Sequence, residues 1–125
     1  MKDYSYISKK YFNYTIEKRQ HKRVVLIGRI KAYKLNGDNK KGRIELFNLS
    51  VGGLGFKSVD EFAVGDVLEF VIDIPKYISM QIMCNIVWRG LSDNGYIYGS
   101  QFVCINNLNR DMIKSYIDGM LTSER

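Results

Sequence analysis

Six short runs of residues typical of β-strands, separated by turn-forming residues, constrain the fold of this chain more than any other feature. The pattern is clearest at 67–74, where valines and carboxylates alternate with large apolar residues. An alternation with a period of two gives a strand one polar and one apolar face. We predict further strands at 24–35, 43–49, 54–58, 79–89 and 96–105.

Turns rich in glycine and asparagine join these runs. The segment 36–42 is typical of a hairpin loop, and other turns are expected at 50–53, 65–66 and 90–95. After the last strand, a helix is predicted from Asn107 or Asn109 to about Leu121. Its apolar stripe would consist of Leu108, Met112, Ile113, Tyr116, Ile117, Met120 and Leu121. Strands and helices do not alternate, which argues against a doubly wound sheet and predicts an antiparallel barrel or a tightly closed sandwich.

Length and composition indicate a single globular domain. The chain has 125 residues, 46% of them hydrophobic, and no apolar stretch near the ~18 residues that span a membrane. Residues 1–6 lack the apolar core of a signal peptide, so we expect a soluble cytoplasmic protein. Cys84 and Cys104 are far apart and His21 is the only histidine, which favours free thiols over a disulfide or a metal site.

Positive charge is concentrated in the first third of the chain. Residues 1–43 contain 13 Lys or Arg and 3 Asp or Glu, whereas residues 44–125 contain 6 and 10. This asymmetry suggests an anionic partner such as a nucleotide, a nucleic acid or a membrane surface, although a solvated basic face has the same composition. Residues 1–16 add tyrosines to the cations, and we expect an aromatic and basic arm that packs on the rest of the protein.

Two short clusters carry the residue types of a binding site. Arg19 and Arg23 lie just before the first strand, and a guanidinium fork binds phosphates or the O6/N7 edge of guanine with two hydrogen bonds. About 25 residues later, the segment 48–53 brings small polar side chains and glycines that let a ligand approach the backbone. Together they predict a pocket for an anionic guanine nucleotide, although the second cluster alone is also compatible with a simple turn.

The order and spacing of these clusters resemble the PilZ domain family. That family carries an RxxxR motif, matched here by Arg19 and Arg23, followed by [DN]xSxxG, matched by Asn48, Ser50 and Gly53. The segments 53–56, 64–67, 86–89 and 98–102 also match. The resemblance implies an all-β fold: a six-stranded antiparallel barrel at about 22–105 with a C-terminal helix at about 107–121. The domain would span 17–125 and follow the arm at 1–16.

The resemblance also implies a receptor for cyclic di-GMP. Arg19 and Arg23 would contact phosphates and guanine edges, Asn48 would accept hydrogen bonds from guanine, and Ser50 would bind a base or phosphate. Gly53 would keep the surface open. Additional contacts are expected from Lys18, Gln20, Gly52 and Trp88. Lys18 precedes the RxxxR motif, where the family determines whether one ligand or a stacked pair is bound, and the number of ligands stays open.

Three classes of function compete at this point. The first is a cyclic di-GMP effector whose basic N-terminal segment becomes ordered on binding and then signals to a protein partner, for example in motility, adhesion or exopolysaccharide control. The second is a PilZ-like adaptor that needs no ligand, and the third, less favoured, is a single-stranded nucleic-acid binder. We expect neither an enzyme nor a cofactor, because the chain has no Ser/His/Asp set and no Walker motif.

Overall fold

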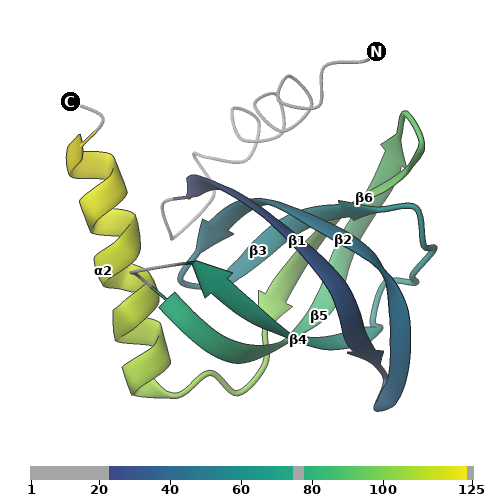
Figure 1. Ribbon diagram of the computed structural model, residues 1–125, viewed down its shortest axis with the longest axis horizontal. Helices are drawn as coiled ribbons and strands as arrows, with labels where there is room; N and C mark the ends of the chain where they lie inside the picture. The colour runs from purple at the N-terminus through teal and green to yellow at the C-terminus, as the bar shows by residue number, and fades with distance from the viewer. Residues whose placement is uncertain (1–22, 75–77, 124–125) are drawn as a thin grey trace.

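The computed structural model describes residues 23–74 and 78–123, which form a closed barrel and one long helix (Figure 1). The elements are β1 (Val24–Leu35), β2 (Asp38–Ser50), β3 (Gly53–Ser58), β4 (Val67–Ile74), β5 (Ile78–Ser92), β6 (Gly95–Phe102) and α2 (Asn107–Ser123). The strands pair antiparallel in the order β1-β2-β3-β6-β5-β4. This confirms the predicted barrel and excludes the sandwich. The expected arm at 1–16 lies outside the described residues.

The turn between β1 and β2 is much shorter than the predicted loop at 36–42. Only Asn36 and Gly37 form it, with φ angles of 50° and 92°. An Asn-Gly pair with positive φ at both residues makes the tight hairpin turn whose twist matches that of its strands. Pairing therefore starts at once, between Leu35 and Asp38, and the lysines expected in the loop belong to β2.

The last two strands also differ from the predicted boundaries. β5 continues to Ser92, because Gly90 and Leu91 pair with Ile97 and Tyr96. The predicted turn at 90–95 is thus reduced to two residues, and β6 ends at Phe102 instead of at 105. A polar composition at the end of a hairpin does not distinguish a loop from exposed strand ends, since both face water.

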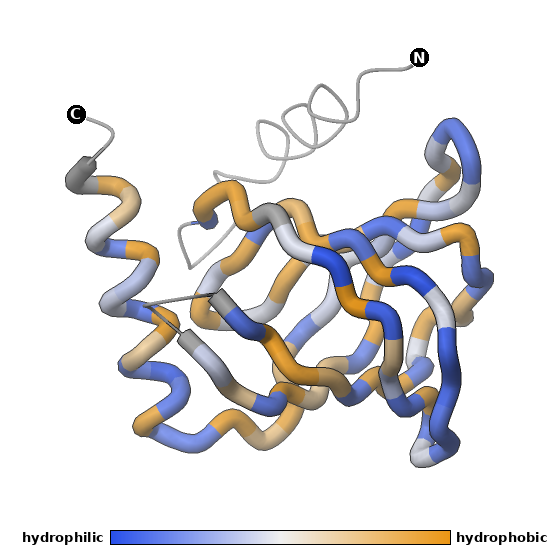
Figure 2. Tube along the Cα trace, in the orientation of Figure 1, coloured by the Kyte–Doolittle hydropathy of each residue, from blue (hydrophilic) through white to orange (hydrophobic). Residues whose placement is uncertain are grey.

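Apolar side chains at alternate strand positions fill the barrel. In β4, Leu68, Phe70 and Ile72 are buried while Val71 is exposed, as the alternation predicts. Figure 2 shows this alternation as short hydrophobic and hydrophilic stretches along the strands. Cys84 belongs to the same core, and burial raises the pKa of its thiol to about 11. Both cysteines are free thiols, as predicted.

Helix α2 packs at the end of the barrel away from the β1–β2 turn (Figure 1). Ile113 and Ile117 enter the core, whereas Leu108, predicted to lie on the apolar stripe, is 69% exposed. The N-cap is Asn106, one residue before the predicted candidates, because its side-chain oxygen accepts a hydrogen bond from the backbone N–H of Asn109 at 2.7 Å. Leu108 lies five residues before Ile113 and nine before Ile117, and at 3.6 residues per turn this spacing points its side chain away from both.

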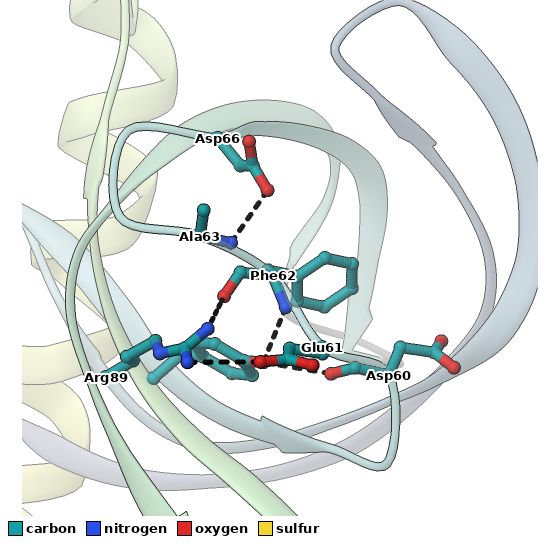
Figure 3. A network of polar contacts seen from close by, with 7 residues as sticks. Asp60, Glu61, Phe62, Ala63, Asp66 and Arg89 are labelled. Carbon is teal, nitrogen blue, oxygen red and sulfur yellow. Dashed lines mark hydrogen bonds and ion pairs between the residues drawn. The ribbon is translucent and has the colours of Figure 1, made fainter.

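The loop between β3 and β4 is fastened to the opposite end of the barrel (Figure 3). Tyr98 accepts a hydrogen bond from the N–H of Phe62 at 2.8 Å and donates to the carbonyl of Asp60 at 2.9 Å. Arg89 donates to the carbonyl of Phe62 at 2.6 Å and pairs with Glu61 at 3.1 Å. Arg89 therefore anchors this loop to β5.

Two tyrosines of this loop network should make the protein sensitive to alkaline pH. Burial raises the pKa of both Tyr33 and Tyr98, and the hydrogen bond that Tyr33 donates to Asp60 raises that of Tyr33 further. The folded protein keeps these protons at a pH where the unfolded chain releases them, near pH 10. The free energy of unfolding should therefore be steady up to about pH 9 and fall above about pH 10. Urea denaturation from pH 7 to 11 checks this, and Tyr33→Phe should show a shallower fall; an equally steep one contradicts the assignment.

Candidate ligand-binding site

Strand pairing brings the two sequence clusters together. Arg23 immediately precedes β1, and β1 begins by pairing Val24 with Leu49 and Val25 with Asn48. Arg23 therefore lies at the level of Ser50, where β2 enters the turn to β3. The second half of the RxxxR motif and the whole [DN]xSxxG motif thus share one corner of the barrel. Lys18, Arg19 and Gln20 lie outside the described residues.

Asn48 is the most unusual polar residue of this corner. It is 0% exposed, and within residues 23–74 and 78–123 neither its Oδ1 nor its Nδ2 has a hydrogen-bond partner. A buried amide without partners costs about 1–3 kcal/mol per unsatisfied group, so native proteins rarely contain one without a functional reason. The donor and the acceptor of this amide are both unused, and they match the mixed donor and acceptor edge of a nucleobase.

Asn48 faces away from the core, on the outside of the barrel. A Cβ atom added to Gly55 would lie 2.7 Å from Oδ1 of Asn48, so the Asn48 side chain lies over this glycine. Gly55 stands between Leu54 and Phe56, both of which point into the core, and therefore belongs to the opposite face of β3. The amide group occupies the space that the missing side chain of Gly55 leaves free.

A row of paired residues extends from Asn48 across four strands. Asn48 pairs with Gly55, Gly55 pairs with Gly99 on β6, and Gly99 pairs with Trp88 on β5. Three strand spacings separate the two ends of the row, which is about 14 Å. Two adjacent glycines in the middle add no side chain of their own between an amide at one end and an indole at the other. Such a strip suits a flat ligand that lies on the sheet.

Irregular strand register places both ends of this row on the outer face. The pairing of β2 shifts between Leu46 and Asn48, and that of β5 shifts between Ile86 and Trp88. Leu46 and Ile86 point into the core. In a regular strand, Asn48 and Trp88 would follow them inward, but each strand has one extra residue in between. In β5, Val87 is the extra residue of a β-bulge, so Trp88 does not continue the inward alternation of Cys84 and Ile86.

Ser50 and Gly53 have clear structural roles in the turn. The Ser50 hydroxyl accepts a hydrogen bond from the N–H of Gly52 at 3.2 Å and lies 3.4 Å from the carbonyl of Gly53. A Cβ atom at Gly53 would lie 1.9 Å from the carbonyl oxygen of Ser100 on β6. The carbonyl of Gly52 accepts a hydrogen bond from Phe102 at 2.9 Å. These contacts hold the turn against β6, and direct ligand contacts by Ser50, Gly52 and Gly53 stay predictions.

Gly55 and Gly99 were not among the site residues predicted from the sequence. Both glycines occur in segments that match the PilZ resemblance, and Gly55 lies two residues after Gly53. Only the strand register shows that they pair with each other and complete the strip. In the described part of the chain, no cluster of His, Cys, Asp or Glu is suited to hold a metal ion. The same residues include no helix that is long and apolar enough to cross a membrane.

Solved structures with the same architecture come from Escherichia coli and Bacillus subtilis. YcgR of Escherichia coli in complex with c-di-GMP superposes with a TM-score of 0.66 at 16% identity, covering 86% of this chain and 48% of that one. MotI/DgrA, the inhibitor of motility of Bacillus subtilis, gives 0.70 at 15% identity, with 86% and 53% covered. This chain thus spans about half the length of these two proteins. The isolated PilZ domain of YcgR with c-di-GMP gives 0.64 at 14% identity, with 86% and 95% covered.

Sequence comparison agrees with the fold. No curated protein matches this sequence. The family model of the PilZ domain, however, matches residues 17–119, which include both motifs and every strand of the barrel. The matched segment is most of the chain, and its strand order, turn motif and terminal helix are those described above. The chain therefore belongs to the PilZ domain family.

Proposed function

We propose that this protein is a receptor for cyclic di-GMP that binds on the strip between Asn48 and Trp88. The observation that carries the proposal is the Asn48 amide, which is fully buried and has no hydrogen-bond partner for either polar atom in the described part of the chain. A guanine edge supplies a donor and acceptors that satisfy both. The neighbouring structures of YcgR with c-di-GMP support this choice of ligand.

The arginines of the RxxxR motif supply the charge that the strip itself lacks. Arg23 is held next to the turn 50–53 by the first pairs of β1 and β2. Arg19 precedes it by four residues, and four residues of extended chain reach at most about 14 Å. This reach equals the width of the strip, so Arg19 can contact a ligand anywhere on it. Two guanidinium groups match the two phosphates of cyclic di-GMP.

Binding then acts as a switch in the segment that carries these arginines. Arg19 and Arg23 close over the ligand and order the segment between them, which changes the surface offered to a protein partner. The role is that of a receptor, and no chemical step is required of the protein. A ligand-independent adaptor would have no use for an unsatisfied amide at Asn48, which favours the receptor.

A titration with cyclic di-GMP tests the proposal. Trp88 is the only tryptophan, so stacking of a base on it should quench the intrinsic fluorescence in step with the heat measured by calorimetry. Arg23→Ala should weaken binding about tenfold or more, since a bidentate arginine–guanine pair contributes roughly 1–3 kcal/mol. Arg110→Ala, an exposed arginine on α2, is the matched control and should bind like the wild type.

Three results would contradict the proposal, either the receptor itself or the place of its ligand. A folded protein that gives neither heat nor quenching at micromolar cyclic di-GMP is an adaptor of the ligand-independent kind. Heat without quenching, unaffected by Arg23→Ala, would place the ligand elsewhere on the barrel. Quenching by single-stranded RNA that cyclic di-GMP does not displace would favour the nucleic-acid reading instead.

A further inference from the structure

The barrel is closed by a very short ladder between its first and fourth strands. Within the described residues, β1 and β4 pair only at Lys34–Glu69 and Leu35–Leu68, whereas β4 and β5 pair at eight positions. Figure 1 shows β1 and β4 diverging from this point toward α2. From Arg29 to Tyr33, β1 therefore faces β4 without a ladder in this part of the chain. Two strand edges that face each other in this way can accept a further strand.

A groove occupies the space where the two strands separate. It has a volume of about 640 Å³, which is within the range of sites that hold ligands of several hundred daltons. Residues 29–34 of β1 form one wall, and Glu69, Phe70, Val71 and Asp73 of β4 form the other. Val71 is 52% exposed although it is apolar. The groove thus combines strand edges with some apolar surface.

The charge around the groove is strongly positive. Arg29, Lys31, Lys34, Lys40 and Lys41 line it, against two carboxylates, those of Glu69 and Asp73. Among the described residues, none of the four lysines forms an ion pair. The Glu69 carboxylate accepts a hydrogen bond from Gln81, which belongs to the same groove. The short Asn-Gly turn creates this surface, because it moves Lys40 and Lys41 out of a loop and onto β2 beside β1.

We infer that this groove binds an extended, acidic segment of a partner protein, which adds as a strand to the edge of β1 or β4. Main-chain hydrogen bonds to the open edge would hold the segment, and alternate side chains would contact the lysines. The residues outside the described ranges do not fit as the occupant, because 1–22 carry six Lys or Arg and two Asp or Glu. A basic segment would meet like charges here.

The groove and the cyclic di-GMP strip lie on different sides of the barrel. In the strand order β1-β2-β3-β6-β5-β4, the junction of β1 with β4 is across from that of β3 with β6, which carries Gly55 and Gly99. Both surfaces can therefore be occupied at once. The inference does not depend on the proposed function, and a failure of one would leave the other intact.

The test uses a six-residue peptide of alternating glutamate and valine, labelled with fluorescein and added to the full chain. Its extended length, about 20 Å, matches the six residues of β1 that line the groove. We expect saturable binding by fluorescence anisotropy, with backbone amide shifts in NMR spectra at 29–34 and 69–73. Saturating cyclic di-GMP should leave this binding in place. A peptide of alternating lysine and valine should bind at least tenfold more weakly.

Matched variants separate strand addition from simple charge attraction. Val71→Asp places a negative charge in the groove and should weaken peptide binding at least tenfold, whereas Val64→Asp, at a loop valine that is 59% exposed, should have no effect. Methylating alternate peptide nitrogens should abolish binding, because it removes the donors that a strand needs. Equal binding of the methylated peptide, or of the Val71→Asp variant, overturns the inference. Binding only to phosphatidylserine vesicles or to RNA overturns it as well.

Discussion

Gly53→Ala is expected to destabilise the whole barrel rather than only its ligand site. A methyl group at this position would lie 1.9 Å from the backbone oxygen of Ser100 and 2.9 Å from the Cα of Gln101. Backbone atoms of a paired strand cannot rotate away, so β3 and β6 must separate at the start of their ladder. We expect a loss of about 3 kcal/mol or more, the upper part of the range for overpacking. The melting temperature should fall by roughly 10–15 °C.

The matched control for this change is Gly119→Ala. Gly119 lies in α2, and nothing is within 4 Å of the position that its Cβ would take. Alanine is favoured over glycine inside a helix by about 1 kcal/mol, so this variant should melt higher than the wild type. Circular dichroism melts of both variants check the pair. If Gly53→Ala melts like the wild type, the glycine of the motif is not required by the contact with β6.

Asn48→Leu is expected to stabilise the free protein while it removes the binding of cyclic di-GMP. The amide of Asn48 is buried with both polar atoms unsatisfied, so an apolar side chain of similar size avoids their desolvation. Removing a buried polar group without partners should raise the free energy of unfolding by about 1–3 kcal/mol. The melting temperature should rise by roughly 4–10 °C, and the affinity should fall about tenfold or more, because the guanine edge loses its partner.

Opposite changes in stability and affinity are the signature of a residue kept for a ligand. Differential scanning calorimetry of the free variant gives the first quantity, and titration with cyclic di-GMP gives the second. A destabilised Asn48→Leu protein would mean that the amide has a structural role in the free barrel. Unchanged affinity would mean that the ligand does not reach this end of the strip. Gly55→Ala offers an independent check, since its methyl would press on the same amide at 2.7 Å.

Much of the fold followed from local patterns. The period-two alternation at 67–74 predicts β4 with its actual bounds, and the spacing after residue 107 predicts α2 to within two residues at its end. The predicted boundaries are wrong where the same residues are compatible with two different local structures. Asn36-Gly37 followed by lysines suits a long loop as well as a tight turn, and the choice depends on pairing with β1. Leu108 is apolar and near the predicted stripe, but its spacing from the buried Ile113 and Ile117 places it on the opposite face of the helix.

The closeness of the two motifs was predictable from the sequence, but the shape of the corner that they share was not. Arg23, Asn48 and Gly53 carry the motifs, and the pairing of β1 with β2 places them together as expected. Three features of the site could not be predicted from the sequence. They are the lack of described hydrogen-bond partners at Asn48, the two glycines beside it and the outward position of Trp88. Each depends on the register of β3, β6 and β5, which long-range packing determines. The same holds for Arg89, whose contacts with the β3–β4 loop span 27 and 28 residues.

The bulges in β2 and β5 determine which residues of this family signature lie on the outer face of the sheet. A homologue that lacked the residue equivalent to Phe47 or Val87 would keep every residue of the motifs. The side chains equivalent to Asn48 or Trp88 would nevertheless turn inward. One-residue deletions in these strands should therefore abolish recognition without changing any contact residue. Transfer of ligand specificity between relatives thus requires equal strand lengths as well as equal motifs.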